Sequence, residues 1–237
     1  MQNRTSIQLA NTGFLVVLLV NLLSNHFHWQ LPQVVSKALL MPLLVTQLFL
    51  AKRNTEEKAW RLVLAGLLAS WLGDLFLLKG AEPSFFIAGL LSFLTAHVLY
   101  ILYYRRYKPS LDQTWFWKHP VISFLVAGYG IAYYAFLLEK LGTMVIPVAI
   151  YCMVITIMLL QALACQETVA PSVYRLFVWG AALFVLSDSI LAFNKFYMPL
   201  EWAGVAIMAT YGFAQLLITN GAMANGDRKD DTPPSES

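Results

Sequence analysis

Two aspartates lie inside stretches of sequence that are otherwise almost entirely apolar. Asp74 lies in RLVLAGLLASWLGDLFLL and Asp188 lies in LFVWGAALFVLSDSILAF, and each stretch is long enough to cross a bilayer. A carboxylate near the bilayer centre costs about 2.5–3.5 kcal/mol on insertion scales, so it usually faces a bundle interior or a wet cavity. We therefore treat both as candidate catalytic residues. The alternative is that each one simply hydrogen-bonds a neighbouring helix.

A histidine and a tyrosine share one face of the apolar segment that follows Asp74. Steps of three and four residues place Phe86, Gly89, Phe93, His97 and Tyr100 on the same side of a helix. Gly89 permits a close approach of a second helix. This face favours His97 as a proton relay or orienting group and Tyr100 as a substrate contact. A packing stripe with a hydrogen-bonded histidine is the alternative.

Three other polar residues could contact a substrate. Ser187 directly precedes Asp188, and Lys195 follows that aspartate by seven residues on the same helix face. Lys37 lies in an earlier apolar segment at a similar distance from the same membrane surface. Either lysine could bind a phosphate as a point charge. The alternative is that both lysines extend to the interface to keep their ammonium groups in water.

The composition excludes several classes of protein. Hydrophobic residues make up 59% of the 237 residues and charged residues only 12%, against about 25% charged in soluble domains, which indicates an integral membrane protein. Two cysteines are too few for a disulfide framework, and a net charge of +3 does not suggest nucleic acid. A catalytic zinc needs about three protein ligands, and no His/Cys cluster accompanies the aspartates. The sequence indicates no cofactor and no obligatory protein partner.

The apolar pattern predicts an all-α polytopic membrane protein with eight transmembrane helices in one domain, residues 1–222. A bilayer requires about 20 residues per helix, and helices satisfy the backbone hydrogen bonds that lipid cannot. The first apolar run continues beyond the length of a signal peptide, so we expect it to be retained. The polar segment 223–237 is expected to be a disordered cytoplasmic tail. The eight predicted spans are about 7–24, 32–51, 60–79, 84–104, 119–138, 143–164, 172–194 and 200–221.

Basic residues predict the orientation of the chain. Twelve lysines and arginines fall on the side that holds both termini, whereas only Lys79, Lys140 and Lys195 fall on the other side. We therefore expect cytoplasmic N- and C-termini.

The two halves of the chain show weak internal similarity. Asp74 and Asp188 are 114 residues apart, and AGLLSFLTAHVLY (88–100) aligns with AGVAIMATYGFAQ (203–215) at an offset of 115. This pattern predicts a parallel 4+4 repeat, with halves at about 1–110 and 115–222. Chance similarity between Gly- and Ala-rich helices is the alternative. The repeat would place the two aspartates at similar depth and about opposite each other. Gly212 would occupy the position equivalent to His97, so His97 has no histidine counterpart.

These motifs together resemble the YhhN-like family, which includes the animal lysoplasmalogenases. The resemblance rests on Gly73-Asp74, the F-x-x-G-x-x-x-F-x-x-x-H-x-x-Y face and Ser187-Asp188-x-x-Leu-Ala, and it extends from Lys37 to the eighth span. It implies an eight-span membrane hydrolase, here expected in a bacterial inner membrane. The substrate implied is a lysoplasmalogen, cleaved at its vinyl ether bond to a fatty aldehyde and a glycerophospho-ethanolamine or -choline. One departure is Ala38, because the family pattern has a proline after the lysine.

Acid catalysis of vinyl ether hydrolysis suits two buried carboxyl groups. The reaction needs a neutral acid to protonate the alkene and a negative charge beside the resulting oxocarbenium ion, as glycosidases also require. Burial and mutual repulsion favour one neutral and one ionised aspartate. His97 lies roughly 10 Å deeper than Asp74 at 1.5 Å per helical residue, so direct contact between them is not expected.

Two other classes of function remain open at this stage. A proton-coupled transporter could use Asp74 and Asp188 as proton-carrying sites, although the spans have few Pro or Gly interruptions. A structural or regulatory membrane protein would leave the two aspartates without a role.

Overall fold

The helices of the protein follow the apolar segments of the sequence. The computed structural model describes residues 2–107 and 114–225. The long helices are α1 (Gln2–His26), α2 (Gln30–Lys52), α3 (Trp60–Leu77), α4 (Pro83–Arg105), α6 (Pro120–Leu137), α7 (Val145–Leu163), α8 (Pro171–Ala192) and α9 (Ala203–Ala224). The short ones are α5 (Thr114–Lys118), the 3₁₀ turns η1 (Leu138–Lys140) and η2 (Gly142–Met144), and the π-helical turn η3 (Phe193–Tyr197).

The predicted all-helical class with eight spans is confirmed. Eight helices are long and apolar enough to cross a membrane, and the described part of the chain contains no strand. Pro83, Pro120 and Pro171 occupy the first turns of α4, α6 and α8, where the missing N–H of proline costs nothing. The sequence did not predict α5 or the π-helical turn. Most of the predicted tail, from residue 226 onward, lies outside the described residues.

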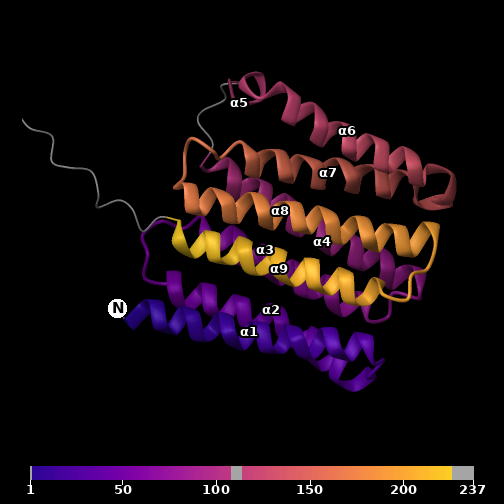
Figure 1. Cartoon of the computed structure of the whole chain (residues 1–237), viewed down its shortest axis with the longest axis horizontal. Helices are drawn as coiled ribbons and strands as arrows, with labels where there is room; N and C mark the ends of the chain where they lie inside the picture. The colour runs from indigo at the N-terminus through magenta and orange to yellow at the C-terminus, as the bar shows by residue number, and fades with distance from the viewer. Residues whose placement is uncertain (1, 108–113, 226–237) are drawn as a thin grey trace, which may run out of the picture.

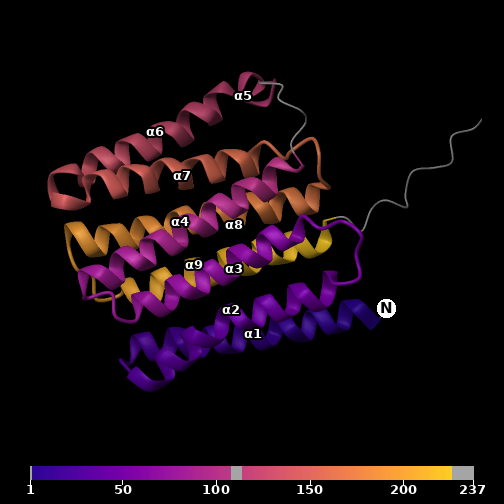
Figure 2. The ribbon, with the colours of Figure 1, turned by 180° about the vertical axis from the view of Figure 1, so that it is seen from behind.

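Four central helices form the middle of the bundle (Figures 1 and 2). The pair α3–α4 packs as one hairpin and the pair α8–α9 as another, and α3 also contacts α9. The pair α1–α2 lies at one edge of the bundle, with α7 and then α6 toward the other edge. Helix α2 contacts both α3 and α9, and α7 contacts both α4 and α8. Asp74 on α3 and Asp188 on α8 are therefore both carried by central helices.

The loops lie at two ends of the bundle. We call the end with loops 53–59 and 164–170, residues 106–107 and helix α5 the basic end, and the end with the connections 27–29, 78–82, 138–144 and 198–202 the opposite end. Asp74 lies three residues before the last residue of α3, or about 5 Å from the opposite end. Asp188 precedes Tyr197 by nine residues and is therefore deeper, at about 13 Å.

Small residues bring α3 and α4 close together beside Asp74. A Cβ atom placed on Gly73 would lie 2.7 Å from the Phe93 ring, so only glycine fits there without displacing that ring. Helix α6 is different, because Leu137 is its one fully buried residue among those described. The bundle is thus tightly packed around α3 and α4 and more open beside α6.

Candidate functional site

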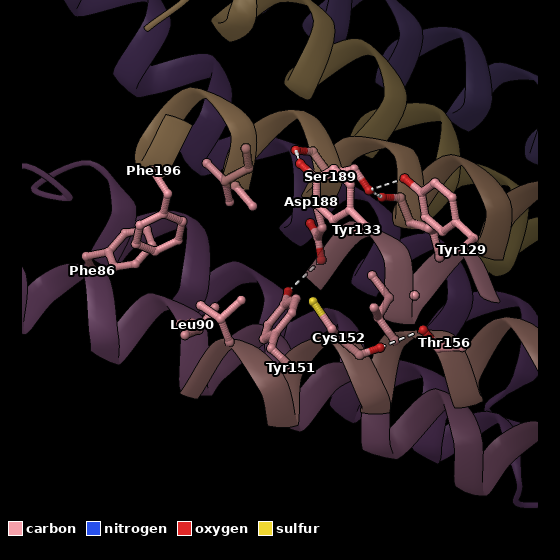
Figure 3. A pocket seen from close by; sticks show the side chains of 16 residues that line it. Phe86, Leu90, Tyr129, Tyr133, Tyr151, Cys152, Thr156, Asp188, Ser189 and Phe196 are labelled. Atoms are coloured by element: carbon pink, nitrogen blue, oxygen red, sulfur yellow. Dashed lines mark hydrogen bonds between the residues drawn. The ribbon is translucent and has the colours of Figure 1, made fainter. Parts of the chain in front are cut away.

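Asp188 lies on the wall of a cavity between α4, α6, α7 and α8. Its Oδ2 atom accepts a 2.5 Å hydrogen bond from the Tyr151 hydroxyl of α7, and 13% of its side chain is exposed. Figure 3 shows the two side chains pointing toward each other in the middle of the cavity, with Phe86 and Phe196 at one end. We call this space the inner cavity. Its wall is mainly aromatic and aliphatic, so an apolar chain bound there would lie against the carboxyl group.

Two tyrosines of α6 close the inner cavity against α8. The Tyr129 hydroxyl shares a 2.7 Å hydrogen bond with Ser189 Oγ, and the Tyr133 hydroxyl donates a 2.5 Å bond to the Ser189 carbonyl. Both tyrosines and Ser189 line the cavity (Figure 3). The polar groups of α6 therefore hold this loosely packed helix next to the helix that carries Asp188.

His97 is the second ionisable residue beside Asp188. Its Nε2 atom lies 3.6 Å from Asp188 Oδ2, which is too long for a hydrogen bond. The ring is completely buried, and neither of its nitrogens has a hydrogen-bond partner among the described residues. Phe184 and Tyr151 contact it edge-on, with ring centroids 4.6 Å and 5.3 Å away. A shift of less than about 1 Å would bring His97 Nε2 within hydrogen-bond distance of the carboxyl group.

Asp74 belongs to a different group of side chains. One carboxyl oxygen accepts a 2.7 Å hydrogen bond from the Tyr211 hydroxyl of α9, and the other lies 3.6 Å from Lys37 Nζ of α2. Only 3% of the Asp74 side chain is exposed, against 16% for Lys37. The buried carboxyl group thus has a cation as a neighbour, whereas the described partners of Asp188 are a tyrosine and a histidine.

Two phenylalanines lie between the groups around the aspartates. The Phe93 and Phe184 rings contact Tyr211 at centroid distances of 5.7 Å and 5.5 Å, and Phe184 also contacts His97. Asp188 is a lining residue of the inner cavity and Asp74 is not. The structure therefore brings His97 to Asp188 and Lys37 to Asp74, and it does not bring both aspartates to the wall of this cavity.

A second, more polar pocket lies at the opposite end of the bundle. We call it the outer pocket; its wall includes Asn25, Gln33, Lys37, Asn194 and Lys195, and its volume is about 250 Å³. Lys195 Nζ donates a 2.9 Å hydrogen bond to the Gly80 carbonyl and lies 4.7 Å from the centre of the Phe86 ring. The two lysines that the sequence suggested as phosphate ligands thus line the same pocket.

Tyr100 and Ser187 make contacts between helices. The Tyr100 hydroxyl donates a 2.7 Å bond to Gln215 Oε1, and Gln215 Nε2 donates a 2.9 Å bond to Ser70 Oγ. Ser187 Oγ donates a 3.1 Å bond to the Ile207 carbonyl. Neither Tyr100 nor Ser187 lines the inner cavity or the outer pocket, so these bonds support packing of α4 and α8 on α9.

The sequence reasoning missed Tyr151 and Tyr211, which donate the hydrogen bonds to the two aspartates. One signal was available, because a tyrosine hydroxyl inside an apolar span needs a polar partner. The spacing also agrees: Tyr151 follows Lys37 by 151 − 37 = 114 residues, the offset that separates the aspartates. A tyrosine at the position equivalent to Lys37 was a testable candidate for a contact with Asp188.

Comparisons with known proteins identify the family of the chain. The chain is 32% identical over 192 residues to the human protein named Lysoplasmalogenase TMEM86B, covering 81% of this chain and 76% of the human one. It is 29% identical to the bovine Lysoplasmalogenase TMEM86A (75% and 71% covered) and 28% identical to the Lysoplasmalogenase of Mycobacterium tuberculosis (70% and 61% covered). No solved structure matches the chain. The model of the YhhN family matches residues 32–222, a span that contains both aspartates and most of the bundle, and the chain therefore belongs to the YhhN family.

Proposed function

We propose that the protein hydrolyses the vinyl ether bond of lysoplasmalogens, releasing a fatty aldehyde and a glycerophospho-ethanolamine or -choline. The observation that carries the proposal is the carboxyl group of Asp188 on the wall of an apolar cavity between membrane-length helices. Relatives over most of the chain are named lysoplasmalogenase, which supports this substrate class. The substrate would come from the surrounding bilayer, and the proposal requires no cofactor or protein partner.

The chemistry needs a proton donor beside an apolar chain. Transfer of the Asp188 proton to the outer alkene carbon forms a C–H bond from the alkene electron pair and leaves an oxocarbenium ion. Water adds to the cationic carbon and gives one proton to the Asp188 carboxylate, which leaves a neutral hemiacetal. The hemiacetal C–O bond to the glycerol oxygen then breaks, the proton of the hemiacetal hydroxyl passes in net terms to that oxygen, and the aldehyde leaves. One water is consumed, and Asp188 regains its proton.

The surroundings of the two aspartates support different roles for them. Asp188 lines the cavity and has uncharged Tyr151 as its hydrogen-bond donor, which suits a neutral acid. Asp74 lies beside the Lys37 ammonium, which favours an ionised carboxylate. In this proposal Asp74 is the electrostatic partner: it binds the Tyr211 hydroxyl, and the Tyr211 ring contacts Phe184 on α8, the helix of Asp188. The base that takes the proton of the water is the Asp188 carboxylate left by the first step. His97, 3.6 Å from Asp188, would orient that acid and help to reprotonate it.

The parallel 4+4 repeat would explain why the bundle contains two buried aspartates, each with its own polar partner. One sequence offset relates the two pairs of contacting residues. Tyr151 follows Lys37 by 114 residues, and Asp188 follows Asp74 by the same 114. His97 and Tyr211 also differ by 114, one residue away from the offset of 115 in the alignment of their helices. We infer that a duplicated carboxylate site diverged, with one copy keeping a cation and the other gaining a neutral donor.

The remaining proposed assignments concern binding and location. Lys37 and Lys195 line the outer pocket and are the candidate phosphate ligands. Tyr100 and Ser187 were also suggested as substrate contacts, but their hydrogen bonds support only an indirect role through helix packing. We propose a multi-pass protein of the bacterial inner membrane with cytoplasmic termini, in agreement with the distribution of basic residues.

Aldehyde release tests the proposed function. Purified protein in lipid vesicles would be given a 1-alkenyl lysophospholipid and, as a matched control, the 1-alkyl analogue, which lacks the alkene and cannot be protonated at carbon. The expected result is aldehyde from the alkenyl lipid only, with one glycerophospho product for each aldehyde. A variant of the exposed loop residue, Glu139→Gln, should behave as the parent protein does.

Two results would contradict the proposed hydrolase. One is the absence of aldehyde from every alkenyl lysolipid given to the folded protein. The other is movement of the intact lipid across the vesicle membrane in response to a pH gradient without cleavage, which would support the proton-coupled transporter instead.

A further inference from the structure

The outer pocket and the inner cavity differ in polarity as the two ends of one amphipathic ligand do. The outer pocket combines two lysines with amide side chains, and no carboxylate is among the residues that form its wall. The inner cavity is mainly apolar and aromatic. Phe86 and Leu191 line both spaces, so the two are neighbours with a shared wall. A molecule with an anionic head and an apolar tail matches this combination in charge and polarity.

Lys195 is fixed at the junction between the two spaces. It lies in the π-helical turn Phe193–Tyr197, and such turns often redirect side chains at functional sites. Its ammonium donates to the Gly80 carbonyl and lies over the face of Phe86, a ring of the shared wall. Its position beside an aromatic face is stabilised by a cation–π contact. Lys195 therefore holds its positive charge against a ring that lines both spaces.

Lys37 is held in the same pocket from the other side. Its ammonium lies 3.6 Å from the buried Asp74 carboxylate, and its side chain is 16% exposed. The acid behind it holds this lysine in place, and the exposed part of the lysine faces the pocket. Phosphate groups bind well to such ammonium groups. Two fixed cations in one pocket with neutral amides provide a site for a phosphate diester.

The spacing along α8 fits the length of a lysophospholipid headgroup. Lys195 follows Asp188 by seven residues, which is about 10 Å at 1.5 Å per residue. Seven covalent bonds separate the phosphorus of a 1-alkenyl lysophospholipid from its outer alkene carbon. An extended chain spans about 3.3–3.6 Å for every three bonds, so these seven bonds reach about 8 Å. A phosphate near Lys195 would therefore bring the alkene to Asp188.

We propose that the outer pocket is the headgroup site of a lysophospholipid, in which Lys195 and Lys37 bind the phosphate and so place the vinyl ether bond at Asp188. This inference rests on the proposed function and extends it, because it names what selects the bond that is cleaved. It also gives Asp74 a positioning role toward the headgroup, through Lys37.

Kinetics with and without a phosphate on the substrate test this site. The substrates are a 1-alkenyl lysophospholipid and the corresponding 1-alkenylglycerol, which lacks the phosphate. Lys195→Met should raise KM at least about tenfold for the phospholipid and leave KM for the alkenylglycerol unchanged, since one charge-assisted contact is lost. Lys195→Arg keeps the cation and should restore much of the affinity. Lys140→Met, a loop lysine at the same end, is the matched control and should change neither value.

Binding without turnover separates this inference from the proposed function. A 1-alkyl lysophospholipid, which cannot react, should raise the Tm of the parent protein and of Lys140→Met but not that of Lys195→Met. Inorganic phosphate alone should give little stabilisation, because it does not occupy the inner cavity. This measurement remains decisive even if no aldehyde is released from any substrate.

Three outcomes would overturn the headgroup site. The first is equal stabilisation of Lys195→Met and the parent protein by the alkyl lysophospholipid. The second is stabilisation by inorganic phosphate as large as that by the lipid, which would indicate a site for the free anion. The third is an equal rise in KM for both substrates in Lys195→Met, which would indicate a general structural role.

Discussion

The Tyr151 hydroxyl donates a 2.5 Å hydrogen bond to Asp188, and this bond joins α7 to α8 at the wall of the inner cavity. Because Tyr151 is only 7% exposed, the bond is shielded from solvent. Hydrogen bonds are electrostatically stronger in such a low-dielectric interior than in water. It orients the carboxyl group toward the space where the substrate chain would lie. The bond thus fixes one of the two carboxyl oxygens of Asp188 in place.

Tyr151→Phe should lower kcat about tenfold with little change in KM. The substitution keeps the ring and removes only the donor, so the inner cavity retains its shape while the acid loses its orientation. Initial rates over a range of alkenyl lysolipid concentrations would separate the two parameters. Tyr134→Phe removes a hydroxyl that does not line the inner cavity and serves as the control. A change confined to KM would argue for substrate binding by Tyr151.

Lys37 and Asp74 should show strong coupling in stability. Lys37→Met leaves a buried carboxyl group without its cation, and loss of one partner of a buried pair typically costs about 3–5 kcal/mol. Asp74→Asn should cost less, because Lys37 is partly exposed and can extend into the outer pocket. The double variant should recover much of the stability lost in Lys37→Met. Unfolding free energies in detergent, combined in a double-mutant cycle, give the coupling. Additive effects would mean that the pair has no energetic role.

Gly73→Ala should destabilise the bundle by about 1–3 kcal/mol, since the added methyl group would overlap the Phe93 ring. The neighbouring Asp74 would move with α3, so activity should also fall. Gly128→Ala on the open helix α6 meets no atom within 4 Å and should be neutral or slightly stabilising. Thermal unfolding of both variants provides the comparison. Equal Tm values would show that α3 and α4 can separate without cost.

Reporter fusions should place both termini on the cytoplasmic side. Eight spans put the two ends of the chain on one face of the membrane, and the basic residues gather there. A fusion at Ser237 should have cytoplasmic reporter activity, and one in the 138–144 loop should not. The reverse result would exclude the proposed orientation.

The spans and the two aspartates could be predicted from the sequence, because they depend on local composition. Length and hydropathy define a transmembrane helix, and a carboxylate within one is conspicuous for its cost. The separation of His97 from Asp74 also followed from helix geometry, and the structure places His97 beside Asp188 instead. These inferences needed no knowledge of which helices pack together.

The partners of the aspartates could not be predicted in the same way. Asp188 is contacted from α7 by Tyr151, and Asp74 is contacted from α9 by Tyr211 and from α2 by Lys37. These contacts depend on which helices are neighbours. Tyr100 has the spacing of a site residue, but its hydroxyl binds Gln215 in the packed core. Helical periodicity gives the face on which a residue lies and not what that face contacts. The mutual repulsion expected between the two carboxyl groups assumed that they lie close together, whereas Phe93 and Phe184 lie between their groups.

The most direct test of the account is aldehyde release by Asp188→Asn. This substitution keeps the size of the side chain and its ability to accept the Tyr151 bond, but it removes the acidic proton. The account predicts that folded Asp188→Asn, with a Tm near that of the parent protein, loses about 10²–10⁴-fold in kcat on alkenyl lysophospholipid. Near-normal aldehyde release by the folded variant would contradict it, because Asp188 could not then be the acid that protonates the vinyl ether.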